Sequence, residues 1–259
     1  MSSPEKIVFV GGAPRSGTSV THALLCTAPG AGRYHPEISF FRHIPLAFRQ
    51  GVTAWDGHTN GFFPDQESFR RFVGDTARQW LGRIGDTLGS PSLLAVKDPH
   101  LTALFPETHA LLPDALFVTV CRHPYAVIRS RQVVFERSSP GASFNEQHVA
   151  QVANEYVAAY ARLLNNDLDG THVMFRYEEL NTTAVRDGLA AFVGVDGFDV
   201  GALWSEVGGV VRDADNPWLT SKYYGEIDID PTVPDLPQGW RDIARGICAS
   251  VMRHVGYEA

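Results

Sequence analysis

Cysteine is scarce in this sequence, and long apolar runs are missing. Cys26, Cys121 and Cys248 are the only cysteines in 259 residues, and their odd number and wide spacing exclude a disulfide framework or a CxxC metal or redox motif. The first apolar stretch, Ile7–Val10, is far too short for a signal peptide or a membrane span. We therefore expect reduced core thiols in a cytoplasmic protein that does not cross a membrane.

Basic residues are also fewer than acidic residues. Lysine and arginine number 22 against 29 acidic residues, so the formal net charge is 22 − 29 = −7. No global positive field is available to recruit nucleic acid or an anionic membrane, and any anion must be bound locally. No two of the histidines considered as metal ligands are four residues apart, as a metal pair on a helix requires. These histidines are His22, His35, His43, His58 and His100. We expect no nucleic-acid partner and no metal.

The composition is that of a globular protein, with 44% hydrophobic and 20% charged residues, and the length suits one domain over 1–259. Four apolar runs are typical of buried parallel strands: Lys6–Val10, Leu93–Val96, Leu116–Cys121 and His172–Phe175. Patterns of helical period lie between and after them: Phe69–Leu88, Val149–Leu163, Val185–Phe192 and Trp240–Val251. This alternation predicts an α/β fold with a central, mainly parallel sheet flanked by helices and ligands at the carboxyl ends of the strands.

Two segments do not fit the alternation. Residues 30–64 are rich in Gly, Pro, His and Phe, and residues 213–237 are rich in Pro, Asp and Tyr. Long irregular segments in a compact domain are usually functional loops, so we expect both to lie on the acceptor side of a site.

A glycine-rich turn follows the first strand. Gly12 and Gly17 have the spacing of the nucleotide-binding loop GxxxxGK[ST], but Thr18 stands where the lysine is required. A strand, a Gly-rich turn and a helix aim backbone N–H groups at a phosphate, and Arg15 and Ser19 add further donors. The missing lysine argues against ATP or GTP hydrolysis while a 5′-phosphate remains a suitable ligand. Alone, the turn is equally compatible with glycines that merely permit positive φ.

Two further cations follow strands. Arg122 follows the third strand, and Ser130 lies eight residues later in the expected helix, so a guanidinium and a hydroxyl can grip a second phosphate. Lys97 follows the second strand. It is either part of a ligand-binding site at the strand end or a surface lysine paired with Asp98.

These residues resemble those of the sulfotransferase family. The stretch Pro14–Ser19 is similar to its 5′-phosphosulfate loop, Pro-[Lys/Arg]-x-Gly-[Thr/Ser]-[Thr/Ser]. The family's Arg and Ser at the spacing of Arg122 and Ser130 hold the 3′-phosphate of 3′-phosphoadenosine 5′-phosphosulfate (PAPS), and the lysine corresponding to Lys97 contacts the sulfuryl group. The resemblance implies a three-layer P-loop fold, PAPS as donor, adenosine 3′,5′-bisphosphate (PAP) as product, and no required metal. The cofactor-binding residues that it implies are Arg15, Ser16, Gly17, Thr18, Ser19, Arg122, Ser130, Tyr177, Ser221 and Lys222.

The general base is the least determined residue. Glu37 matches the glutamate of the tyrosylprotein and heparan N-sulfotransferase branch, which makes it the first choice, with Lys97 and Arg15 as its catalytic partners. The steroid and phenol branch uses a histidine in Lys-Thr-His, to which Lys97–His100 is similar only with one intervening residue; His100 is second and His35 third. In Arg176–Leu180 the resemblance places Tyr177 near the adenine, and we interpret Glu178 and Glu179 as charges at a helix start.

The predicted activity is transfer of a sulfuryl group from PAPS to a hydroxyl, or in second place an amine, of a small molecule, lipid or sugar. Two alternatives stay open: a non-catalytic P-loop module that binds a nucleotide or phosphate for regulation, and a small-molecule kinase. The sequence leaves the oligomeric state open.

Overall fold

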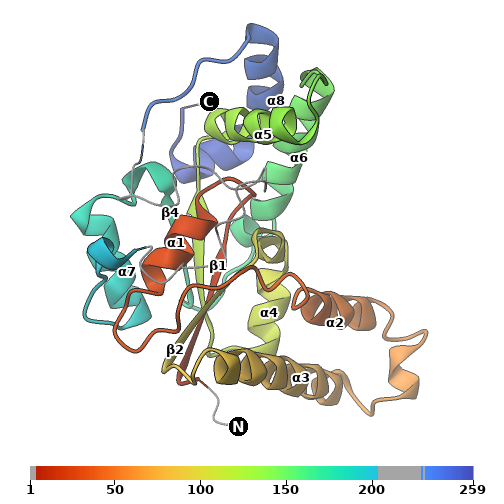
Figure 1. Ribbon diagram of the computed structural model, residues 1–259. Helices are drawn as coiled ribbons and strands as arrows, with labels where there is room; N and C mark the ends of the chain where they lie inside the picture. The colour runs from red at the N-terminus through yellow and green to blue at the C-terminus, as the bar shows by residue number, and fades with distance from the viewer. Residues whose placement is uncertain (1–3, 204–228, 230, 259) are drawn as a thin grey trace.

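The computed structural model describes residues 4–203, 229 and 231–258. Its sheet has four parallel strands in the order β2-β1-β3-β4 (Figure 1). Their bounds are β1 Lys6–Gly11, β2 Leu93–Lys97, β3 Leu116–Cys121 and β4 His172–Arg176. All four predicted strands are confirmed, and three of them extend one residue further toward the candidate site.

Eight α-helices and five short 3-10 helices lie in the described residues. The α-helices are α1 Thr18–Leu25, α2 His43–Thr53, α3 Gln66–Thr87, α4 Phe105–Leu111, α5 Pro124–Ser138, α6 Glu146–Tyr160, α7 Thr183–Val193 and α8 Gln238–Val255. The 3-10 helices are η1 Thr59–Gly61, η2 Pro99–Leu104, η3 Leu163–Asn165, η4 Tyr177–Glu179 and η5 Val200–Ala202. Within the parts of the chain that the structure describes, no helix combines the length and apolarity needed to cross a bilayer.

The central strand β1 shows why helices cover both faces of the sheet. Its buried side chains alternate: Phe9 packs into the core under α2, α3 and α4, whereas Val8 and Val10 pack into the core under α1 and α7. A third apolar cluster joins α5, α6 and α8 beside the end of β3, and Figure 1 shows these three helices grouped together. The predicted three-layer α/β fold is confirmed. The extent of a single domain over 1–259 stays a prediction.

The segment 30–64 is not irregular throughout, which corrects the expectation from its composition. It contains α2, whose Ile44 and Phe48 are buried, and the ring centroid of Phe48 lies 5.7 Å from that of Phe69 in α3. Pro45 is in the first turn of α2, where a missing N–H group costs the helix nothing. Tertiary packing therefore forms a helix that the proline and glycine content concealed. Of the segment 213–237, the described residues 231–237 contain no helix or strand.

Gly12 is required by the close approach of β1 and β3. Its φ is 145°, and a Cβ atom there would lie 2.3 Å from the backbone oxygen of Val120. We predict that Gly12→Ala lowers the free energy of unfolding by at least about 1–3 kcal/mol, because a strained backbone conformation is added to a clash that no side chain can relieve. Urea unfolding measures the change.

Gly82→Ala is the matched control. Gly82 lies within α3, and a Cβ there meets nothing within 4 Å. Alanine is preferred over glycine in a helix, so this variant should be unchanged or up to about 1 kcal/mol more stable. Equal effects of the two substitutions would contradict the stated role of Gly12.

Candidate active site at the carboxyl ends of the strands

The four strands deliver the candidate residues to one edge of the sheet. Val10 is in register with Lys97, so the lysine lies beside the start of the glycine-rich loop. Cys121 is in register with Arg176, so Arg122 and Tyr177 both follow directly at the neighbouring strand ends. Parallel strands end at a common edge, and this edge is where ligands bind in open α/β sheets.

The loop from Gly12 to α1 has the backbone of an anion site. Gly17 precedes α1 with φ 103°, and Arg15 has φ 75°, a left-handed conformation that is rare outside glycine. The amide of Thr21 bonds back to Gly17 O, and the amides that precede it at the start of α1 are oriented outward, as at every helix N-terminus. A phosphate at this end gains from those amides and from the helix dipole.

Two hydroxyls from other elements fix this loop. Thr102 Oγ1 in η2 accepts from the amide of Gly12 at 2.7 Å, and the hydroxyl of Tyr160 in α6 accepts from the amide of Ala13 at 2.9 Å. Tyr160 also lies 3.1 Å from the buried Ser16 Oγ. The Ser16 side chain therefore supports the loop from within, and its predicted contact with a cofactor stays a prediction.

The second predicted anion site adjoins the first. Arg15 Nε donates to Ser130 Oγ at 3.0 Å, and Arg122 Nη1 lies 3.4 Å from Arg15 O. Arg122 Nε is buried and finds no hydrogen-bond partner in the described residues, while its guanidinium lies 4.5 Å over the Tyr177 ring. A buried donor without a partner is costly, so an anion bound here would stabilise the arrangement.

The ring of Tyr177 also packs against the glycine-rich loop. A Cβ atom at Gly17 would lie 2.2 Å from the Tyr177 ring, so the two residues are in direct contact. The ring therefore lies between the loop and Arg122, and its predicted role near an adenine stays a prediction. Ser221 and Lys222 lie outside the described residues.

Lys97 pairs with the candidate base. Its Nζ is 2.8 Å from Glu37 Oε1, and the Lys97 side chain is 5% exposed against 44% for Glu37. The amide of Ile38 donates to Lys97 O at 3.1 Å, which fixes the segment after α1 against the end of β2. The alternative of a surface lysine paired with Asp98 is wrong, because Asp98 instead accepts from the His100 amide and lies 3.7 Å from Arg42.

Two histidines lie beneath this ion pair. The Nε2 atoms of His22 and His35 lie 3.1 Å and 2.9 Å from the same acceptor, Ala95 O. Burial lowers the pKa of both histidines, and Lys97 lowers each further. Both are therefore neutral at pH 7 beside a cationic Lys97. His35 is fixed to the backbone in this way, whereas His100, the second candidate base, is exposed at the start of η2.

Glu178 and Glu179 lie in η4, and each also has a specific partner. Glu178 accepts from the His123 amide at 3.0 Å and from the Tyr257 hydroxyl at 2.6 Å, and Glu179 pairs with Arg176. The sequence placed Tyr160 within the predicted helix Val149–Leu163, but it assigned no role to Thr102 or Tyr257 and did not predict these contacts. The i, i+4 spacing of Tyr156 and Tyr160 places both tyrosines on one face of α6, and this spacing was the available sequence signal for their shared role.

The fold is a parallel α/β sheet with a glycine-rich loop and two adjoining candidate anion sites at the carboxyl ends of its strands. The chain belongs to the sulfotransferase family, because the model of the Sulfotransferase family matches residues 7–196. A protein of Caenorhabditis briggsae described as a candidate protein-tyrosine sulfotransferase is 28% identical over 186 residues, which are 70% of this chain. This chain spans only 61% of the length of that relative.

Solved structures show the same fold. The sulfotransferase domain from the curacin biosynthetic pathway has a TM-score of 0.62 at 17% identity, with 99% of both chains covered. A mouse sulfotransferase complexed with PAP has a TM-score of 0.55 at 14% identity, covering 100% of this chain and 91% of the mouse chain.

Buried histidines predict acid sensitivity. Burial lowers the pKa of His172 to about 4, and it also lowers the pKa of His22 and His35. In the unfolded chain these groups take up protons near pH 6.5, so their contribution to stability is present above that pH and is lost as the pH falls toward 4. His172→Gln should show a shallower loss of unfolding free energy over this range, measured by urea unfolding at several pH values.

The exposed His58 supplies the control for this prediction. His58→Gln should follow the wild-type pH dependence. Identical slopes for His172→Gln and the wild type would contradict the assignment of a partly buried, neutral His172.

Proposed function

We propose that this protein transfers a sulfuryl group from PAPS to an acceptor hydroxyl. The observation that carries the proposal is the buried Nε of Arg122, which has no partner among the described residues, next to the glycine-rich loop; Lys97 at the end of β2 pairs with Glu37 on the other side of that loop. PAPS has two anionic groups that match these two sites, one on the 5′ and one on the 3′ side of its ribose. The PAP in the mouse relative supports this donor.

Lys97 and Glu37 take complementary roles in an in-line displacement at sulfur. A bond forms between the acceptor oxygen and sulfur, and the bond from sulfur to the bridging phosphate oxygen breaks. Lys97, with Arg15 and the loop amides, stabilises the negative charge that grows on the departing oxygen, and one such preorganised donor is worth about 3–4 kcal/mol. Glu37 takes the proton from the acceptor. Its ion pair with Lys97, at 2.8 Å, holds the carboxylate at the end of β2.

The surface beside Glu37 favours an apolar or ring-bearing acceptor. Phe40, three residues after Glu37, is 50% exposed, and its ring centroid lies 5.6 Å from that of Trp80 in α3. We place the acceptor hydroxyl on a small molecule, lipid or sugar, with an amine second because an alkylamine must first lose a proton at neutral pH. The name of the Caenorhabditis briggsae relative adds tyrosine peptides to the acceptors for testing.

The site gives less support to the two alternatives. A kinase of the P-loop type needs the loop lysine that Thr18 replaces. A non-catalytic phosphate-binding module leaves the nearly buried Lys97 and its pairing with Glu37 without a purpose, although burying a charge is expensive.

Arg122→Ala tests the 3′-phosphate assignment. The variant should bind PAP about 10- to 100-fold more weakly, because hydrogen bonds to a charged group contribute roughly 1.5–3 kcal/mol. Binding of AMP, which has no 3′-phosphate, should change less than about twofold. Calorimetry with both ligands measures this. Arg78→Ala, an exposed arginine of α3, is the control, and equal losses for PAP and AMP would contradict the assignment.

Glu37→Gln tests the base. Screening with labelled PAPS against phenols, sterols, sugars and tyrosine peptides first identifies an acceptor. The variant should then lose about 10²–10⁴-fold in kcat, because general-base catalysis contributes this much, while PAP affinity stays unchanged.

Glu155→Gln removes a comparable carboxylate that pairs with Arg131, and it should retain wild-type turnover. A fully active Glu37→Gln protein would transfer the role of base to His100.

A further inference from the structure

Three side chains from outside β3 contact the backbone around Arg122. Tyr156 of α6 donates to Arg122 O at 3.0 Å, Glu178 of η4 accepts from the His123 amide at 3.0 Å, and Tyr257 lies 3.1 Å from Cys121 O. These are the polar groups of the peptide units on either side of Arg122. The β3–β4 ladder ends at Cys121, so these contacts continue the restraint beyond the sheet.

Tyr257, which follows α8, connects two of these restraints. Its hydroxyl lies 2.6 Å from Glu178 Oε2, and its ring centroid is 5.1 Å from that of His123. One carboxylate therefore receives both the Tyr257 hydroxyl and the His123 amide. Burial and then the bond to Glu178 raise the pKa of Tyr257, so its hydroxyl keeps the proton that it donates.

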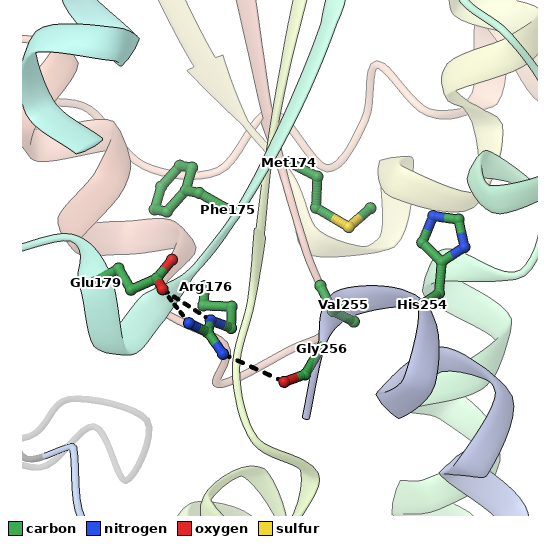
Figure 2. A pocket seen from close by; sticks show the side chains of 7 residues that line it. All are labelled: Met174, Phe175, Arg176, Glu179, His254, Val255 and Gly256. Atoms are coloured by element: carbon green, nitrogen blue, oxygen red, sulfur yellow. Dashed lines mark hydrogen bonds and ion pairs between the residues drawn. The ribbon is translucent and has the colours of Figure 1, made fainter. Parts of the chain in front are cut away.

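Arg176 holds the segment after α8 in place. Its guanidinium lies between Glu179 and the Gly256 carbonyl, with Nη1 3.3 Å from Gly256 O (Figure 2). It also lies 5.8 Å from the centre of the Tyr257 ring. These contacts border a pocket of about 460 Å³ between β4 and the end of α8. Residues of β4 and η4 therefore fix the position of Tyr257 beside the turn that contains Arg122.

We propose that Tyr257 is a positioning residue for the 3′-phosphate site, acting through Glu178 on the backbone that carries Arg122. The inference rests on the proposed function, because it assumes that Arg122 binds the 3′-phosphate. Tyr257 orients Arg122 Nε, which has no partner among the described residues, without touching the ligand. Hydrogen bonds of this supporting kind fix the geometry of groups that bind directly.

The test is the ratio of PAP to AMP affinity in the full chain. Tyr257→Phe should raise the Kd for PAP about tenfold, as expected for the loss of one hydrogen bond to a charged group, and should leave the Kd for AMP within about twofold of the wild type. Tyr125→Phe is the matched control, because the Tyr125 ring also packs against His123, at 4.8 Å, and its hydroxyl has no hydrogen bond in the described residues. It should keep the wild-type ratio.

Variants of Glu178 test the same chain of contacts independently. Glu178→Gln keeps an acceptor but loses the charge, so it should raise the Kd for PAP only about threefold, since neutral hydrogen bonds are roughly half as strong. Tyr257→Phe combined with Glu178→Ala should bind PAP no more weakly than Glu178→Ala alone, because the two residues act in one chain of contacts.

The outcomes separate the two claims. A wild-type protein that binds PAP and AMP equally overturns the proposed function. A wild-type protein that prefers PAP, with an unchanged PAP-to-AMP ratio in Tyr257→Phe, overturns the role of Tyr257 alone. Additive losses in the double variant, or equal losses for PAP and AMP, also overturn it.

Discussion

The ion pair between Lys97 and Glu37 is the interaction on which the site depends. An ammonium that is almost fully buried needs a partner, and Glu37 meets that need from a segment 60 residues away in sequence. The pairing brings the loop after α1 against the end of β2 and so places a carboxylate beside the glycine-rich loop. The neutral histidines beneath, His22 and His35, leave Lys97 as the positive charge at this point.

Tyrosine hydroxyls organise the remainder of the edge. Tyr160 fixes the glycine-rich loop, Tyr156 and Tyr257 fix the turn that carries Arg122, and the thiol of Cys121, whose pKa burial raises to about 12, stays protonated beside Tyr156. The groups that would meet the donor are thus held before it arrives. Such preorganisation is what allows a site to stabilise developing charge without rearranging.

Much of this arrangement is predictable from the sequence. Apolar runs ending in reactive residues gave the four strands and placed Lys97 and Arg122 at one edge, because parallel strands share a direction. Helix α2 was not predictable from its composition, since burial of Ile44 and Phe48 against other elements forms it. The contacts of Tyr257 with Glu178 and Cys121 were also inaccessible, because they join residues separated by 79 and 136 positions. No local pattern encodes such a contact.

Together, the two candidate anion sites should recognise a nucleotide phosphorylated at both the 3′ and 5′ positions. Calorimetric titration of the wild-type protein with PAP and with ATP, side by side and without metal, tests it most directly. PAP should bind at least about tenfold more tightly than ATP, which corresponds to about 1.4 kcal/mol. Equal binding of the two nucleotides, or a preference for ATP, would contradict it.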